Sequence, residues 1–249
     1  MTATSRAATL ARRRTIEAER DARSPHRSDG FFVPELAWAA FARTCLRVAG
    51  LHGRGRRNLL DFDVHEREVD LQRLPPAFDG YRILQLTDLH LDVLDGFWDG
   101  VRAASAPLAW DLCVLTGDYR YRKSGPVGPC MDALTALRPS LGDDVIAILG
   151  NHDRASMVDT MEAMGIRMLV NESTTLQRGG AVVDVLGVDD PHLFRTDDLD
   201  AAVAGLPPGR CRLLLAHSPE MPVAAARHDV DLYLAGHTHG GQIAWPGGR

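Results

Sequence analysis

The stretch DVIAILGNHD (144–153) joins a short apolar run to a cluster of polar side chains. Residues 145–149 are all apolar, which is the length and character of a strand buried on both faces. Gly150 follows as a turn residue, and an amide, an imidazole and a carboxylate come directly after it. The run therefore predicts a strand of a buried sheet whose carboxyl end carries functional side chains.

Four further runs repeat this pattern of an apolar strand that closes on a polar or glycine turn. They are YRILQLTD (81–88), DLCVLTGD (111–118), RCRLLLAH (210–217) and DLYLAGH (231–237). Segments of helical length and composition lie between the runs, at 128–138, 155–165, 197–205 and 219–228. This alternation predicts a sheet covered by helices. Residues 167–190 instead predict consecutive strands with a hairpin turn at Gly179-Gly180, so we expect a mixed α/β architecture.

The composition is that of a globular protein with one sizeable core, at 249 residues with 45% hydrophobic and 24% charged content. The first 60 residues hold twelve Arg against five acidic residues (net +7), and the rest hold sixteen basic against twenty-eight acidic (net −12). An acidic body without a basic stripe argues against nucleic acid as a partner. An acidic domain that binds a polyanionic substrate would then need metal ions to neutralise the charge of that substrate. The four cysteines have no CxxC spacing, so we expect buried, reduced thiols.

The N-terminal part of the chain differs from the body. Residues 1–30 offer little that could pack, so we expect a disordered or weakly helical tail. The apolar stretch 31–50 is interrupted by charges and falls short of the ~20 apolar residues of a membrane span. Residues 36–50 predict a basic amphipathic helix, which either lies on an anionic membrane surface or packs against its own domain. Residues 53–57 (GRGRR) predict a linker.

We therefore divide the chain into a basic N-terminal tail with an amphipathic helix (1–57) and a catalytic domain (58–249). Residues 1–30 have the arginines of a secretory signal without its apolar core, so export is not expected. We expect a cytoplasmic location, with peripheral attachment to the inner membrane as the alternative.

Every one of the five strands ends in side chains that can ligate a metal ion. These residues are Asp88, His90, Asp118, Asn151, His152, Asp153, His217, His237 and His239. Because the carboxyl ends of strands in an α/β sheet meet at one edge, we expect these side chains to converge. Oxygen and imidazole ligands without thiolates suit hard to borderline divalent cations and exclude a zinc finger. A lone histidine is more often a core residue than a ligand, but so many buried polar groups would each be costly without partners.

The elements DLH, GDY, GNHD, AH and GHTH resemble, in order, the pattern of the calcineurin-like metallophosphoesterase superfamily over residues 88–239. The flanking QLTDLHLD, GVDD, AHSP and GHTHGGQ look most like a bacterial, often membrane-associated branch. That branch acts on phosphodiester-type substrates and includes relatives that cleave the pyrophosphate of UDP-2,3-diacylglucosamine. The resemblance implies a four-layer α/β/β/α sandwich of two mixed sheets. In the family further strands follow the last motif, whereas ten residues follow His239 here, so we expect an incomplete second sheet.

The resemblance also implies a role for each residue. One metal ion would be held by Asp88, His90 and His239, and the other by Asn151, His217 and His237, with Asp118 as the bridge. Two cations about 3.5–4 Å apart clamp a phosphate and activate a water molecule as hydroxide. His152 matches the family's histidine near the leaving group, and Asp153 would orient it. Arg120 could reach a phosphate, although exposure to solvent is favoured.

The sequence therefore predicts a dinuclear metal-dependent phosphoester hydrolase, most of all a phosphodiesterase that uses metal-activated hydroxide. The ligand types do not determine the identity of the two ions, because Mn, Fe, Zn, Ni and Co all accept such oxygen and nitrogen ligands. One alternative is a lipid-linked nucleotide pyrophosphatase of envelope biosynthesis, motivated by residues 31–50, and another is a non-catalytic metal-binding scaffold. The expected partner is a phosphate-ester small molecule or a lipid-linked substrate. The histidines outside the motifs are expected to be surface or loop residues, and His192 in DDPH is the one among them that we retain as a candidate site residue.

Overall fold

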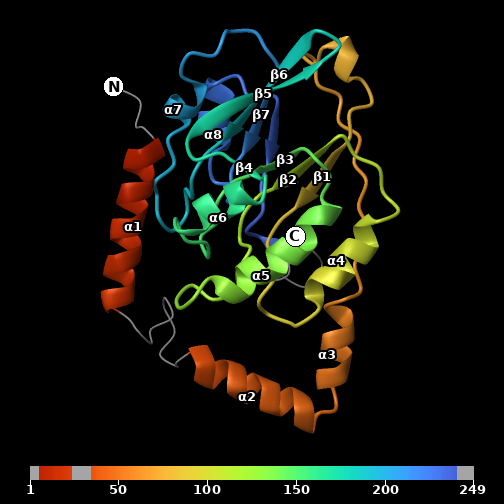
Figure 1. Cartoon of the computed structure of the whole chain (residues 1–249), viewed down its shortest axis with the longest axis vertical. Helices are drawn as coiled ribbons and strands as arrows, with labels where there is room; N and C mark the ends of the chain where they lie inside the picture. The colour runs from red at the N-terminus through yellow and green to blue at the C-terminus, as the bar shows by residue number, and fades with distance from the viewer. Residues whose placement is uncertain (1–5, 24–34, 240–249) are drawn as a thin grey trace.

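The computed structural model describes residues 6–23 and 35–239, and their core is two four-stranded sheets packed face to face (Figure 1). The first sheet has the order β1-β2-β3-β4, with β1 (Ile83–Leu86), β2 (Leu112–Leu115), β3 (Val145–Ala147) and β4 (Arg167–Met168). The second has the order β5-β6-β7-β8, with β5 (Glu172–Arg178), β6 (Ala181–Gly187), β7 (Arg212–Leu215) and β8 (Leu232–Leu234). Single 3-10 turns occur at Pro76–Phe78 and Arg138–Ser140.

Helices cover the outer face of each sheet. The first sheet carries α4 (Phe97–Ser105), α5 (Gly128–Leu137) and α6 (Met157–Ala163), and the second carries α7 (Leu199–Val203) and α8 (Pro222–Arg227). The expected four-layer sandwich is confirmed. The prediction that both sheets are mixed is wrong for the first sheet. Among the described residues, all strand pairs of the first sheet are parallel, and only the second sheet is mixed. A helix follows each of β1, β2 and β3, and such crossovers return the chain in the same direction.

The predicted hairpin is confirmed at Gly179-Gly180. β5 and β6 pair antiparallel with Arg178 opposite Ala181, whereas β6, β7 and β8 run parallel. The start of the same segment behaves differently from the prediction. β4 pairs with β3 in the first sheet, so the chain passes from one sheet to the other between Met168 and Glu172.

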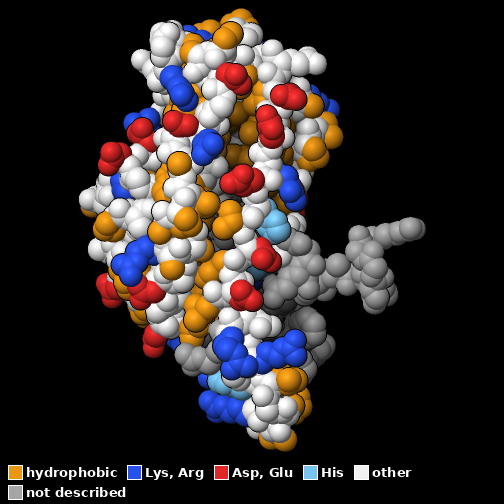
Figure 2. Space-filling model, turned by 90° about the vertical axis from the view of Figure 1, so that its right-hand side faces the viewer, with side chains coloured by type: hydrophobic (Ala, Val, Ile, Leu, Met, Phe, Trp, Pro, Cys, Tyr) orange, Lys and Arg blue, Asp and Glu red, His pale blue; other side chains and the backbone are white. Residues whose placement is uncertain are grey.

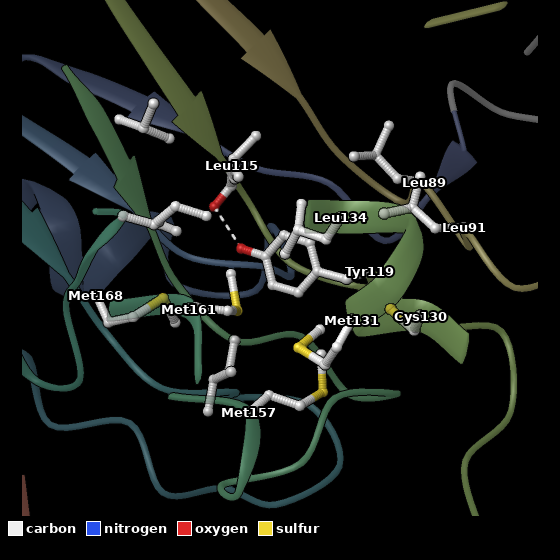
Figure 3. Close-up of a cluster of buried hydrophobic side chains, with 14 of the residues drawn as sticks. Leu89, Leu91, Leu115, Tyr119, Cys130, Met131, Leu134, Met157, Met161 and Met168 are labelled. Carbon is white, nitrogen blue, oxygen red and sulfur yellow. Dashed lines mark hydrogen bonds between the residues drawn. The ribbon is translucent and has the colours of Figure 1, made fainter. Parts of the chain in front are cut away.

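Three apolar layers hold the four structural layers together. Side chains alternate along a strand, so Cys113 and Leu115 of β2 face the helices while Leu112 and Val114 face the second sheet. A third cluster lies between the second sheet and α7 and α8. Figure 3 shows the layer beneath α5 and α6, where the buried Tyr119 hydroxyl donates to the carbonyl oxygen of Leu115. This packing fixes the strand ends from which the functional loops leave.

The helical alternative expected for residues 1–30 is confirmed over α1 (Arg6–Arg23), but α1 packs against the sandwich, so the expectation that these residues do not pack is wrong. Its buried residues are Thr9, Leu10, Arg13 and Glu17, whose spacing of three or four places them on one helix face. The partners of this face are mainly charged and polar groups more than 100 residues away. A sequence that reads as solvated is therefore held by ion pairs and hydrogen bonds instead of a large apolar stripe.

α2 (Glu35–Val48) confirms the predicted helix within 36–50, and α3 (His52–Asn58) follows it. The prediction of a linker at 53–57 is wrong, because these residues form α3. The two helices lie away from the sandwich at the lower end of Figure 1. Among the described residues, we find no helix with both the length and the apolar character needed to cross a membrane.

Candidate metal centre

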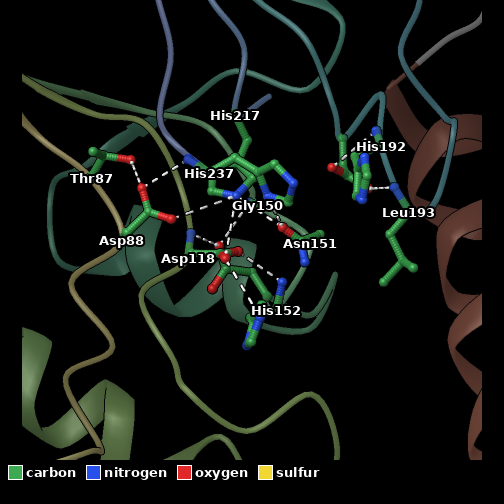
Figure 4. A network of polar contacts seen from close by, with 12 residues as sticks. Thr87, Asp88, Asp118, Gly150, Asn151, His152, His192, Leu193, His217 and His237 are labelled. Carbon is green, nitrogen blue, oxygen red and sulfur yellow. Dashed lines mark hydrogen bonds and ion pairs between the residues drawn. The ribbon is translucent and has the colours of Figure 1, made fainter. Parts of the chain in front are cut away.

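The loops that follow five strands meet at one end of the sandwich and bring the predicted ligands together (Figure 4). β1 leads to Asp88 and His90, β2 to Asp118, β3 to Asn151, β7 to His217, and β8 to His237 and His239. Within each of several overlapping groups, one ligand atom per residue lies within 4.8 Å of the others. The groups are Asp88, His90 and His239; Asp88, Asp118 and His217; and His90, Asp118 and His152.

The first half of the centre consists of Asp88, His90 and His239. The Nε2 atoms of the two histidines face each other at 3.4 Å, with the rings stacked. Asp88 Oδ1 lies 3.4 Å from His239 Nε2 and is buried without a hydrogen-bond partner in the described part of the chain. Two facing imidazole nitrogens and a buried bare carboxylate oxygen are unfavourable unless a cation or proton lies among them. The donor set therefore fits a divalent metal ion.

The second half consists of Asn151, His217 and His237. His217 Nε2 and His237 Nδ1 each lie 3.0 Å from the Asn151 side-chain oxygen. Asp118 lies beside this half, with Oδ2 at 3.3 Å from His217 Nε2, and it also belongs to a group with His90 of the first half. Asp118 therefore joins the two halves of the ligand cluster.

Backbone carbonyls orient two of the imidazoles. His217 Nδ1 lies 2.8 Å from the Thr116 carbonyl oxygen, and His90 Nδ1 lies 2.8 Å from that of Arg120. A ring nitrogen that donates to a carbonyl carries the proton, which leaves the lone pair of the other nitrogen available to a metal. Both Nε2 atoms point toward the other ligands. The two carbonyls thus orient both rings with Nε2 toward the other ligands.

Asp118 and His217 form a buried ion pair. Burial opposes the charge on His217, but the Asp118 carboxylate outweighs it and raises the pKa of His217 to about 9. Burial likewise opposes the charge on Asp118, whereas His217 and His152 hold the pKa of Asp118 well below its usual range. A metal ion bound here must displace the His217 proton.

Backbone strain gathers at the predicted ligands. Among the described residues, eight non-glycine residues have positive φ, and five of them are predicted ligands. These five are Asp88, His90, Asp118, His237 and His239, with φ between 42° and 69°. Each such conformation costs on the order of 1 kcal/mol and persists only where the surroundings enforce it. The strain therefore marks these loops as shaped for a purpose other than stability.

Glycines in the motifs permit close approach of the loops. A Cβ at Gly236 would lie 1.9 Å from Thr87 Oγ1, and one at Gly150 would lie 2.2 Å from Asp118 Oδ1. Neither position can carry a side chain without displacing a ligand loop. The two glycines that follow His239, at 240 and 241, lie outside the described residues.

His152 lies at the centre, but its orientation has a different cause from the expected one. Its Nδ1 is 2.6 Å from the Tyr121 carbonyl oxygen, and burial lowers the pKa of the ring to about 4. Asp153 instead accepts hydrogen bonds from the backbone N–H groups of Asp118, Tyr119 and Gly150. Burial and the nearby Asp118 charge raise the pKa of Asp153 to about 6. Asp153 therefore ties two ligand loops together, and the prediction that it orients His152 is wrong.

A cavity of about 350 Å³ opens beside the ligands. Its lining comprises Arg20, Asp118, Lys123, Asn151, His152, His192, Leu193, His237 and His239. His192 is thus near the centre, with its ring 4.4 Å from that of His237 and its Nδ1 2.5 Å from Glu220 Oε1 (Figure 4). Sequence reasoning missed Arg20 and Lys123, because neither stands in a motif. The residues that α1 buries are mostly polar, so its docking left no apolar signal in the sequence.

Arg120 corrects a further expectation. Its side chain is buried, and Nη2 donates to the carbonyl oxygens of Ser124 and Gly125 at 2.9 and 3.2 Å. Burial lowers the pKa of its guanidinium. Arg120 supports the loop after Asp118 from inside, so the prediction of a solvent-exposed side chain is wrong.

Comparison with known proteins agrees with this geometry. The model of the family described as calcineurin-like phosphoesterase matches residues 81–241. The chain is 29% identical to the uncharacterized metallophosphoesterase YkoQ of Bacillus subtilis over 202 residues, which cover 78% of this chain and 73% of YkoQ. It is 29% identical to the phosphodiesterase YaeI of Escherichia coli over 181 residues, covering 67% of this chain and 63% of YaeI.

Among solved structures, the calcineurin-like phosphoesterase YfkN of Bacillus subtilis aligns with 64% of this chain and 72% of its own, at 14% identity and a TM-score of 0.46. The family model alone covers more than half of the sequence and contains every proposed ligand. The strand-end ligands and the two-sheet fold lie within the matched region. The chain therefore belongs to the calcineurin-like phosphoesterase family and is a metallophosphoesterase.

Proposed function

We propose that the protein is a dinuclear metal-dependent phosphodiesterase. The observation that carries this proposal is the convergence of seven oxygen and nitrogen ligands, Asp118 among them, at the strand ends, with Asp88 Oδ1 buried and unpaired in the described chain. Asp88, His90 and His239 would hold one divalent ion, and Asn151, His217 and His237 the other. The donor atoms suit Mn, Fe or Zn. When bound, the two ions would neutralise the phosphate charge and lower the pKa of a water molecule between them.

His152 is the proposed donor to the leaving group. Because Nδ1 faces the Tyr121 carbonyl, Nε2 carries a proton only when the ring is a cation. Burial disfavours that cation in the free protein, as the lowered pKa of the ring, about 4, indicates. An anionic phosphate beside the ring would favour the charged form and thereby raise this pKa. His152 would then give its proton to the departing oxygen.

The test is a reconstituted hydrolysis assay. Chelator-treated protein is loaded with Mn, Fe or Zn and supplied with bis(p-nitrophenyl) phosphate, a phosphomonoester, a cyclic nucleotide and a nucleotide diphosphate lipid. We expect metal-dependent turnover that is highest on a diester and is abolished in Asp118→Asn. His65→Ala is the matched control, because His65 is exposed and outside the centre. Turnover in Asp118→Asn equal to that of the wild type would refute the proposal.

A lipid-linked nucleotide pyrophosphatase of the UDP-2,3-diacylglucosamine type is the second candidate, and α2 is the reason. Phe41, Leu46 and Val48 are exposed large apolar residues, and Arg43 and Arg47 on the same helix are exposed as well. Figure 2 shows basic and hydrophobic side chains side by side at the lower end of the molecule. Such a surface complements an anionic lipid headgroup layer and its acyl boundary. We propose peripheral attachment to an anionic membrane through α2.

Vesicle sedimentation tests this attachment. We expect the protein to sediment with phosphatidylglycerol vesicles but not with phosphatidylcholine vesicles, and Arg43→Glu/Arg47→Glu to abolish sedimentation. Hydrolysis of bis(p-nitrophenyl) phosphate in solution should be unchanged by this double substitution. Equal sedimentation of the variant and the wild type would rule out α2 as the attachment site. Turnover of UDP-2,3-diacylglucosamine above that of the simple diester would favour this second candidate.

A further inference from the structure

The wall of the cavity that α1 contributes is positively charged. Arg20, in the last turns of α1, and Lys123, in the loop after Asp118, line the cavity together with the metal ligands. Among the described lining residues, Asp118 is the sole acid, and its charge is committed to the proposed ions. Arg20 and Lys123 are cationic side chains of the cavity wall that are not among the proposed metal ligands.

α1 is fixed to the loop that carries the ligands. Arg13 is fully buried; its Nη2 donates to the carbonyl oxygens of Gly150 at 2.6 Å and Asp153 at 2.9 Å, and its Nη1 pairs with Asp189. Glu17 accepts a hydrogen bond from the Ala155 backbone N–H at 2.8 Å. These contacts therefore fix the position of α1 relative to the centre, and with it the backbone position from which the Arg20 side chain extends.

The loop that carries Lys123 is held from two sides. Arg154 pairs with Asp21 of α1 through its two terminal guanidinium nitrogens, Nη1 and Nη2, at 2.8 and 2.7 Å. Its Nη2 also donates to the Lys123 carbonyl oxygen at 3.0 Å. Arg120 holds the carbonyls of the next two residues from inside. Lys123 and His152 line the same cavity. Arg20 and Lys123 thus both line the cavity from elements whose positions are fixed.

We propose that Arg20 and Lys123 bind a second anionic group of the substrate, so that α1 determines substrate specificity. The inference rests on the proposed phosphodiesterase function. The preferred substrate is then a phosphodiester with a further phosphate or carboxylate on its alcohol portion. Arginine forms bidentate, charge-assisted hydrogen bonds with such groups, and lysine adds a point charge. A cavity of about 350 Å³ is within the range of small-molecule sites and admits more than a single phosphate.

A matched substrate pair tests this inference. The 5′-(p-nitrophenyl phosphate) esters of thymidine and of thymidine 3′-phosphate differ only in the second phosphate. We expect the wild type to prefer the 3′-phosphorylated ester in kcat/KM, and Arg20→Ala or Lys123→Ala to lower that preference about tenfold, mainly through KM. Arg20→Lys should keep part of it. Arg23→Ala is the control, because Arg23 lies on the same helix with a 79% exposed side chain.

The outcomes separate the two proposals. The inference is overturned if Arg20→Ala keeps the full preference, or if it slows both esters equally, which would indicate a purely structural role. If metal-loaded wild type hydrolyses neither ester, the phosphodiesterase proposal fails, and calorimetric binding then decides the inference. Tighter binding of thymidine 3′,5′-bisphosphate than of thymidine 5′-phosphate, lost in Arg20→Ala, would support the second anion site. Equal binding of the two nucleotides by the wild type would refute it.

Discussion

Replacing Arg13 by alanine tests whether α1 is a working part of the centre. The substitution leaves Asp189 fully buried without its cation and removes the donor to the Gly150 and Asp153 carbonyls. It also removes the guanidinium that lies 4.0 Å from the Phe194 ring. Breaking one partner out of a buried ion pair costs about 3–5 kcal/mol. This exceeds what a short docking helix with few apolar contacts can spare, so we expect α1 to detach before the sandwich unfolds.

Hydrogen exchange and kinetics read out that detachment. In Arg13→Ala, amides of residues 6–23 should lose protection, and those of residues 150–155 should lose part of theirs. We expect kcat to fall about tenfold to a hundredfold, because the two carbonyls that Arg13 holds flank Asn151 and His152. Arg13→Lys keeps the charge without the planar fork and should be intermediate.

Arg14→Ala is the control for this experiment, since Arg14 is the exposed neighbour on the same helix. It should leave both protection and turnover close to those of the wild type. Our reasoning is refuted if Arg13→Ala and Arg14→Ala show the same exchange pattern and the same kcat.

Three further outcomes follow from the structure. Gly236→Ala places a Cβ 1.9 Å from Thr87 Oγ1, so it should lower the free energy of unfolding by about 1–3 kcal/mol and reduce the amount of bound metal. Urea unfolding and elemental analysis measure the two effects. Full metal content in the variant would contradict this prediction. Metal affinity should fall about tenfold per pH unit below pH 9, because Asp118 raises the pKa of His217 to about 9 and the His217 proton must leave before metal binds. Calorimetry in two buffers of different ionisation enthalpy should detect the released proton. A metal affinity that does not change with pH would contradict this prediction. Leu134→Ala, at a fully buried position on the inner face of α5, should lower the free energy of unfolding by about 2–5 kcal/mol in urea. A loss below about 1 kcal/mol would mean looser packing than described.

The strands and the centre could be anticipated because each ligand lies within four residues of the end of an apolar run. A buried strand with a polar end places its ligands by topology alone, so the sequence separation of Asp88 and His239 is irrelevant. The switch of β4 into the first sheet could not be anticipated, because a two-residue strand carries no periodicity. In the same way, Gly53 and Gly55 lower helix propensity enough to hide α3.

The docking of α1 was hidden for a different reason. Its stabilising contacts are charges that meet partners such as Asp189, 176 residues away, and composition cannot reveal such pairs. The role of Asp153 was misassigned because adjacency to His152 suggested contact, whereas its carboxylate turns toward backbone amides. Both errors arise where a polar side chain satisfies groups that are remote in sequence.

Counting the metal ions that accompany turnover tests the central claim most directly. Apoprotein is titrated with Mn while bound metal and bis(p-nitrophenyl) phosphate hydrolysis are measured on the same samples. We predict two ions per chain, with hydrolysis rising to its maximum only as the second ion binds, and one ion with no hydrolysis in His217→Ala. Two bound ions without hydrolysis of any phosphodiester, or full activity with a single ion, would contradict a dinuclear phosphodiesterase.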